Sequence, residues 1–152
     1  MASALYPDQV TADFVLSNNV LTLFLEGSTL DGGDLSYTNL NNAYMSNSSM
    51  VGADLSYTNF TNTELVGADL SSSICVYSLF NAADLTNADL SSALCAGADF
   101  TGANLSNADL SDSDLTNTLF TGAELGGADF SGADMTGMDV TSVNFATNPL
   151  FS

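Results

Sequence analysis

Apolar residues recur at every fifth position along most of this chain. Every residue whose number is a multiple of five, from Val20 to Leu150, is Leu, Phe, Met, Val or Cys, without an insertion or deletion. A helix repeats about every 3.6 residues and a strand about every 2, so neither element keeps such a period on one face. The pattern predicts a solenoid in which each five-residue unit forms one side of a coil and then turns.

A short motif carries this period. Its clearest form is Ala-Asp followed by Leu, Phe or Met, at residues 53–55, 68–70, 83–85, 88–90, 98–100, 108–110, 128–130 and 133–135. The residue two places before each apolar position is Ala, Ser, Thr or Gly from Ser28 to Ala133. Each repeat thus pairs an apolar residue with a small one at a fixed spacing.

The motif and its unbroken register resemble the pentapeptide repeat family, whose unit is commonly written A(D/N)LXX, over about residues 28–147. This resemblance implies an all-β fold, a right-handed quadrilateral parallel β-helix. It implies about six coils of about 20 residues, which would form a rod on the order of 29 Å long. The apolar residue and the small residue two places earlier would point inward, and the residue between them outward.

Residues 20 positions apart would stack in such a coil, and the inward columns can be read from the sequence. One column gathers aromatic rings into a ladder and reads Leu40, Phe60, Phe80, Phe100 and Phe120. Cys75 and Cys95 share another column, one coil apart. Their separation allows a disulfide, but parallel stacked side chains rarely meet its dihedral requirement, so buried free thiols are favoured.

The predicted organisation is an N-terminal cap at residues 1–27, the β-helix at 28–147 and a C-terminal cap at 148–152. Within the first cap, the segment from Pro7 to Phe14 suggests a short helix, and Val20–Leu25 is a dense apolar run that would cover the first coil. Pro149 lacks an N–H and would end the ladder of backbone hydrogen bonds.

Charge excludes several functions. The chain of 152 residues has 18 acidic residues and no Lys, Arg or His, so its formal net charge is −18. Nothing in it could neutralise a phosphate backbone or an anionic membrane, which excludes direct binding of nucleic acid or of such membranes. The usual general bases, Schiff-base amines and imidazole ligands are also missing. We therefore expect no enzyme, no catalytic residue and no cofactor.

A metal site is also not predicted. The segment Gly126–Gly132 resembles the Gly-Asp calcium repeat, and Asp109, Asp112 and Asp114 lie close in sequence. Carboxylate oxygens suit Ca²⁺. The period is five throughout, however, whereas the calcium repeat has a period of about nine. A diffuse cation atmosphere around the acidic rod is the better expectation.

Outward positions provide the first candidate site. Asp69, Asp89, Asp109 and Asp129 would lie on one side in consecutive coils, and we call them the acidic ladder. A column of fixed charge would meet a basic docking surface or divalent cations. Alternatively, the ladder only keeps the surface solvated, because Asp and Asn are the family's habit at this position.

The second candidate site is an interruption of the polar surface. Apolar or aromatic residues replace polar ones within about one coil, and this apolar patch comprises Ile74, Val76, Tyr77, Leu79 and Leu94. Tyr37, Tyr57 and Tyr77 are 20 residues apart and should stack at one corner. Such a patch is typical of a docking site. Alternatively, the tyrosines only form a corner ladder that stacking stabilises.

Two functions remain. The first is a non-enzymatic structural or interaction protein, a rigid acidic rod that docks into a larger protein assembly as a scaffold. The second is a DNA mimic that binds a type II topoisomerase such as gyrase and inhibits or protects it, as one branch of the family implies. The apolar patch, the lack of projecting loops and the lack of residues for a C-terminal pairing helix favour the first.

Solution behaviour follows from the same residues. Rods without a basic residue should repel one another at low salt, so a monomer is expected in isolation. No signal peptide or transmembrane segment is visible in the sequence, which predicts a soluble protein, cytoplasmic by default. The sequence does not identify the partner.

Overall fold

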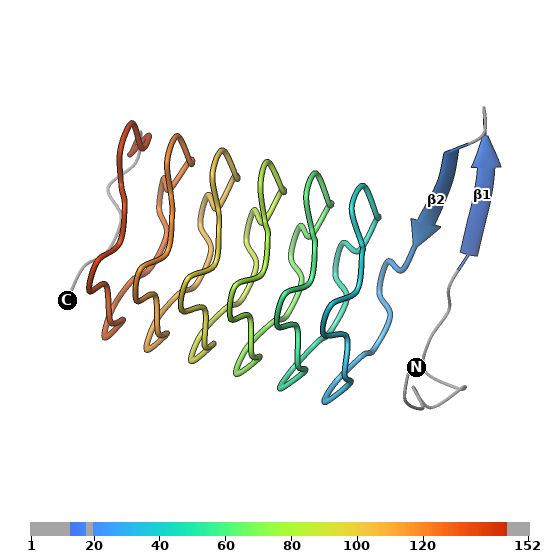
Figure 1. The fold of residues 1–152 in the computed structure, drawn as a ribbon, viewed down its shortest axis with the longest axis horizontal. Coiled ribbons are helices and arrows are strands. Elements are labelled where there is room, and N and C mark those ends of the chain that lie inside the picture. Colours follow the sequence, from blue (N-terminus) through green and yellow to red (C-terminus); the bar gives the residue numbers. More distant parts are fainter. Residues whose placement is uncertain (1–12, 18–19, 146–152) are drawn as a thin grey trace.

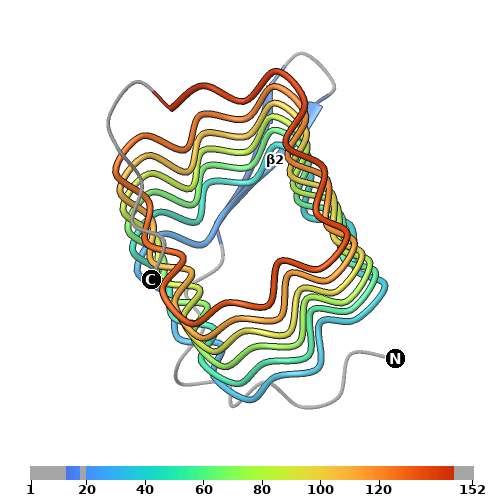
Figure 2. The ribbon, with the colours of Figure 1, turned by 90° about the vertical axis from the view of Figure 1, so that its left-hand side faces the viewer.

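The protein is a straight stack of coils. The computed structural model describes residues 13–17 and 20–145, and its coils follow one another along the rod (Figure 1). Seen along the rod, each coil has four sides (Figure 2). Parallel bridges join residues 20 apart, from Phe24–Tyr44 to Glu124–Asn144, so residues 25–144 make six coils. The predicted all-β quadrilateral β-helix is confirmed.

A hairpin precedes the first coil. Strand β1 (Asp13–Ser17) pairs antiparallel with β2 (Val20–Phe24), with Asp13 opposite Phe24 and Ser17 opposite Val20. At its end β2 joins the coils, because Phe24 bridges Tyr44 and the two rings stack with centroids 4.9 Å apart. Figure 1 shows the hairpin at the N-terminal end of the stack.

The helix predicted for Pro7–Phe14 is wrong where it can be compared with the structure. Phe14 lies in β1 and pairs with Leu23 of β2, so its backbone joins a strand ladder instead of a helical turn. Pro7 lies outside the described residues. The domain bounds at residues 27 and 147 also stay predictions, since 1–12, 18–19 and 146–152 are not described.

Backbone hydrogen bonds connect each coil to the next. The N–H of Asp89 donates to the Ala68 oxygen at 2.9 Å, and the N–H of Leu90 donates to the Asp109 oxygen at 2.7 Å. The same pair of bonds recurs on every side of the coil along most of the stack. The interior coils therefore leave few of these strand-like groups without a partner, as a parallel sheet does.

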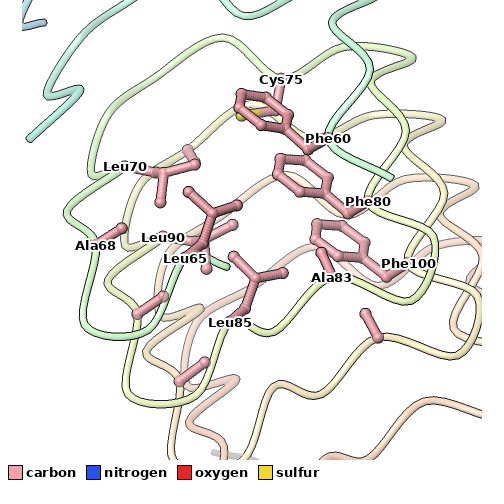
Figure 3. Close-up of a cluster of buried hydrophobic side chains, with 14 of the residues drawn as sticks. Phe60, Leu65, Ala68, Leu70, Cys75, Phe80, Ala83, Leu85, Leu90 and Phe100 are labelled. Atoms are coloured by element: carbon pink, nitrogen blue, oxygen red, sulfur yellow. The ribbon is translucent and has the colours of Figure 1, made fainter. Parts of the chain in front are cut away.

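The core is built from columns of identical or similar side chains. Phe60, Phe80, Phe100 and Phe120 are fully buried, and their rings stack at centroid separations of 4.9, 4.7 and 5.0 Å with interplanar angles of 5°, 2° and 4°. These separations match the spacing of about 4.8 Å between hydrogen-bonded strands. Leucine columns face the rings across the interior (Figure 3). The inward side chains of each coil thus pack on the equivalent side chains of the next coil.

Small inward residues include hydroxyls that must find a partner. Ser78 Oγ donates to the Cys75 backbone oxygen at 2.6 Å, and Thr58 Oγ1 donates to the Leu35 oxygen at 2.7 Å. Ser48 is the exception, because its buried Oγ has no hydrogen-bond partner within the described part of the chain. A buried polar group without a partner lowers stability.

We therefore expect Ser48→Ala to raise the free energy of unfolding by about 1 kcal/mol, since it removes an unsatisfied hydroxyl. Alanine fits this column, because Ala68 and Ala88 occupy the equivalent buried positions of the next coils. Urea unfolding followed by circular dichroism would measure the change. The matched Ser78→Ala variant breaks the bond to Cys75 and should lower stability by about 1 kcal/mol. Equal losses in both variants would contradict the expectation.

Candidate interaction surface

Every corner of the coil turns in the same way. The N–H of Ser28 donates to the Leu25 oxygen at 3.1 Å, which closes a β-turn, and this turn recurs after five residues. The third residue of each turn, from Gly27 to Ser142, has positive φ, and 10 of these residues are Gly and 6 are Asn. Such φ angles cost little for Gly and are tolerated by Asn, whereas larger side chains are strained there.

Three tyrosines occupy one corner column in spite of this strain. Tyr37, Tyr57 and Tyr77 have φ of 57°, 57° and 55°, in a region that costs a bulky residue about 1–2 kcal/mol. Their rings stack with centroids 4.8 and 5.4 Å apart, and the exposed fractions of the side chains are 76%, 47% and 55%. We call these three residues the tyrosine corner. Stacking offsets part of the strain.

Gly97 ends the tyrosine corner. It is the next residue in the column, and a Cβ added to it would meet the ring of Tyr77. The ring of Tyr77 is also tilted by 29° from that of Tyr57, whereas Tyr37 and Tyr57 differ by 6°. Tyr77 therefore lies over the backbone of the following coil, and glycine leaves room for it.

We expect Gly97→Ala to displace the Tyr77 ring and to lose stability. Gly102 is a matched control, because its φ of 68° is close to the 69° of Gly97 and a Cβ there would meet nothing. Both variants should lose about 1 kcal/mol through the positive φ. Only Gly97→Ala should change the near-ultraviolet circular dichroism of tyrosine. An unchanged spectrum would contradict the contact.

The apolar patch surrounds this corner. Ile74 and Leu94 lie in consecutive coils on the side before the corner, and Leu79 lies on the side after it. All three side chains are exposed, while Val76, next to Tyr77, is half-buried. The structure therefore brings the five residues predicted for the patch together around the tyrosine corner.

Aspartate or asparagine normally fills the outward positions for a structural reason. The Oδ1 of Asp54 accepts the N–H of Ser56 at 3.0 Å, and Asn59 Oδ1 accepts the N–H of Thr61 at 2.9 Å. These bonds satisfy a donor that the turn leaves free. An apolar side chain cannot do so, and the N–H groups of Val76, Asn81 and Ala96 have no hydrogen-bond partner in the described part.

The acidic ladder makes the same bonds. Asp69, Asp89, Asp109 and Asp129 each accept the N–H of the residue two places later, at 3.0, 2.8, 2.9 and 2.8 Å. Hydrogen bonds from the hydroxyl and N–H of Ser131 lower the pKa of Asp129. The ladder is therefore a fixed column of charge with a structural role of its own. It lies on the side opposite Leu79 and on the side next to that of Ile74 and Leu94, so it borders the patch without being part of it.

Sequence reasoning left out one residue of this surface, Gly97, and one exposed leucine that lies beyond it, Leu119. Leu119 lies on the same side as Leu79, two coils further along, and its exposed fraction is 40%. Asp99 separates the two leucines. Burial raises the pKa of Asp99, but hydrogen bonds from Thr101 and Asn81 lower it more. Gly97 was the other omission, and its place 20 residues after Tyr77 was the signal that could have found it.

The two cysteines do not form a reactive site. Cys75 and Cys95 are free and fully buried in adjacent coils, and the Ser73 hydroxyl lies 3.1 Å from the Cys75 sulfur. Hydrogen bonding to Cys75, together with burial, raises the pKa of Cys95 well above its usual value. Cys95 is therefore poorly suited to nucleophilic chemistry, which requires the thiolate.

The described residues contain neither a metal-binding cluster nor a membrane-spanning helix. Within 13–17 and 20–145, no group of three or more His, Cys, Asp or Glu side chains is arranged to hold a metal ion. The same residues contain no helix long and apolar enough to cross a membrane.

Comparisons with known proteins agree with the geometry. The chain matches the family described as Pentapeptide repeats in 8 copies, within residues 25–62, 33–71, 63–94, 78–117, 98–137 and 108–145. No curated protein matches it.

Several solved structures are similar to this chain. HetL, a pentapeptide repeat protein involved in heterocyst differentiation regulation from the cyanobacterium Nostoc, is 21% identical, with a TM-score of 0.40 over 83% of this chain and 84% of HetL. QnrB1, a plasmid-mediated fluoroquinolone resistance protein, is 18% identical, with a TM-score of 0.48 over 79% and 82%. A pentapeptide repeat protein from the Arabidopsis thaliana thylakoid lumen is 30% identical, with a TM-score of 0.31 over 72% and 66%.

Proposed function

The chain belongs to the pentapeptide repeat family, and from this premise we propose that it is a rigid acidic rod that docks into a larger protein assembly through its tyrosine corner and apolar patch. Proteins of this family are generally non-enzymatic structural or interaction proteins. In a rod of this kind each coil contacts only its neighbours, and the stack keeps its shape. Such a rod can hold a binding surface in a fixed place within an assembly.

One observation carries the proposal. Ile74, Leu79 and Leu94 replace residues that would satisfy a backbone donor, and all three surround one corner. The chain therefore gives up hydrogen bonds and exposes apolar surface at the same place. Clustered aliphatic and aromatic side chains supply most of the binding energy in protein interfaces. A local loss of stability together with an exposed apolar cluster supports a docking surface.

Photo-crosslinking would test the docking site. A photoreactive amino acid is placed at Tyr57 or Leu79 and, as a control, at Asn104, which lies on the side opposite Ile74 and Leu94. In extracts of the source cells, positions 57 and 79 should both link to one protein that position 104 does not reach. Equal labelling of that protein from position 104 would contradict the proposal.

A second candidate function is a DNA mimic that binds gyrase. The acidic ladder favours it, because four carboxylates follow one another in consecutive coils and hydrogen bonds hold each in place. Supercoiling by purified gyrase would be measured with the protein added at two salt concentrations. Inhibition that weakens with salt, and that is lost in Asp69→Asn/Asp89→Asn/Asp109→Asn, would support the mimic. Supercoiling unchanged at both salt concentrations would contradict it.

The oligomeric state is part of the proposal. With 18 acidic residues and no basic ones, copies of the rod repel one another at low salt, so the isolated protein is a monomer. Light scattering at low ionic strength measures the mass directly. A stable dimer under those conditions would contradict the proposal.

A further inference from the structure

At its first member, Tyr37, the tyrosine corner has a ring face that no other tyrosine covers. Tyr37 begins the stack, and Tyr57 contacts one face of its ring, which leaves the Tyr37 side chain 76% exposed. Most other corners use Gly or Asn, which adopt the same positive φ without strain. A strained residue that persists on the surface is a starting point for a hypothesis of function.

Aromatic faces attract cations. A guanidinium or ammonium group within about 6 Å of a ring centroid is stabilised by the negative face of the ring, and arginine is the commoner partner. This chain has no Lys, Arg or His, so none of its own side chains can supply that group. A cationic side chain must therefore come from another molecule.

The surroundings of the corner are acidic and apolar together. Asp34 and Asp54 precede Ile74 and Leu94 on one side, and Asp99 follows Leu79 on the other. Hydrogen bonds from the hydroxyl and N–H of Ser36 lower the pKa of Asp34, so this carboxylate stays charged. A partner that matches both features needs positive charge for the carboxylates and aliphatic side chains for the patch.

We infer that the tyrosine corner and apolar patch bind a partner segment that carries both arginine and aliphatic side chains. A guanidinium group lies on the face of the Tyr37 ring that Tyr57 does not cover, and the aliphatic side chains cover Ile74, Leu79 and Leu94. This inference rests on the docking function proposed above and adds the chemistry of the partner. It assigns the tyrosines a binding role besides their role in the stack.

A peptide of alternating arginine and leucine is the probe. Binding to the full chain is followed by calorimetry and by tyrosine fluorescence, which no tryptophan obscures because the chain has none. Two further peptides replace arginine by its neutral isostere citrulline, or leucine by serine. We expect the arginine–leucine peptide to bind about tenfold or more tightly than either of them.

Two variants locate the binding. Tyr37→Asn/Tyr57→Asn/Tyr77→Asn removes the rings with a residue that the corner tolerates, since Asn42 and Asn62 have the same backbone conformation. It should weaken the probe at least about tenfold. The control, Asp69→Asn/Asp89→Asn/Asp109→Asn, removes charge from another side and should leave most of the affinity intact.

Each result decides between the proposals. Equal binding of the citrulline and arginine peptides at the patch would overturn the cationic partner and leave the docking function standing. Binding that the tyrosine variant does not change, and that falls with the acidic ladder instead, would mean general attraction to an acidic rod and would overturn the inference, whereas the crosslinking experiment decides the docking function. No binding of the arginine–leucine peptide would also overturn the inference.

Discussion

Alanine at Phe80 lowers the free energy of unfolding by about 3–5 kcal/mol, the largest loss that we expect from a single side chain in this rod. Phe80 is fully buried and stacks on Phe60 at 4.9 Å and on Phe100 at 4.7 Å. Its removal leaves a cavity between two rings that the hydrogen-bonded coils hold at a fixed separation. The walls cannot close around it, so the full cost of the cavity remains.

Urea unfolding of Phe80→Ala and Phe80→Leu would measure this loss. Leucine is the matched control, since Leu40 occupies the same column. It fills most of the space, and we expect it to cost about 1–2 kcal/mol less than alanine. In a stack where only neighbours interact, a defect in the middle also weakens cooperativity, so the denaturant slope of Phe80→Ala should fall. Equal stability of the two variants would contradict a rigid cavity.

The sequence predicts most of this fold because one register controls it. A single five-residue period determines which side chain points inward and where each turn lies. Parallel backbone hydrogen bonds to the next coil keep this register along the stack. The aromatic column at Phe60–Phe120 follows from that register alone. Its contact with the opposite column does not, because Phe130 meets Phe120 edge-on at 6.1 Å and an interplanar angle of 80°. Contacts between columns depend on side-chain rotamers that a period does not describe.

The N-terminal hairpin escaped prediction for a related reason. Phe14 lies outside the five-residue register, and nothing local distinguishes a short helix from a strand there. Pairing with β2 decides the matter. Long-range pairing of this kind is not contained in a local pattern.

The candidate site could be located from the sequence but not interpreted from it. Ile74 and Leu94 stand out because polar residues are expected at their positions. The structure adds that an acidic or amide side chain there satisfies a backbone N–H, so its absence has an energetic cost. It also adds that Tyr37, Tyr57 and Tyr77 are strained. The partner remains a proposal, since recognition depends on a molecule outside the chain.

Asparagine at all three apolar positions should separate binding from stability. The variant Ile74→Asn/Leu79→Asn/Leu94→Asn keeps the net charge and restores the side chain that Asn59 and Asn104 use to accept a backbone N–H. Each new bond contributes about 0.5–1.5 kcal/mol, whereas the apolar area that the three side chains still bury is lost, since their exposed fractions are 37%, 41% and 47%. These two effects oppose each other, so we expect the free energy of unfolding to change by about 1 kcal/mol or less in urea unfolding.

The same variant should lose its partner. Crosslinking from position 57, which none of the three substitutions changes, should fall at least about tenfold, because clustered apolar side chains dominate the energy of an interface. Leu119→Asn is the control, since it removes an exposed leucine on the side of Leu79 but two coils away. It should leave the crosslink unchanged. If the triple variant keeps the crosslink, the three exposed apolar side chains do not contribute to binding and are only variations of the repeat. A stable rod without its crosslink would mean that these three positions are retained for binding at the expense of hydrogen bonds.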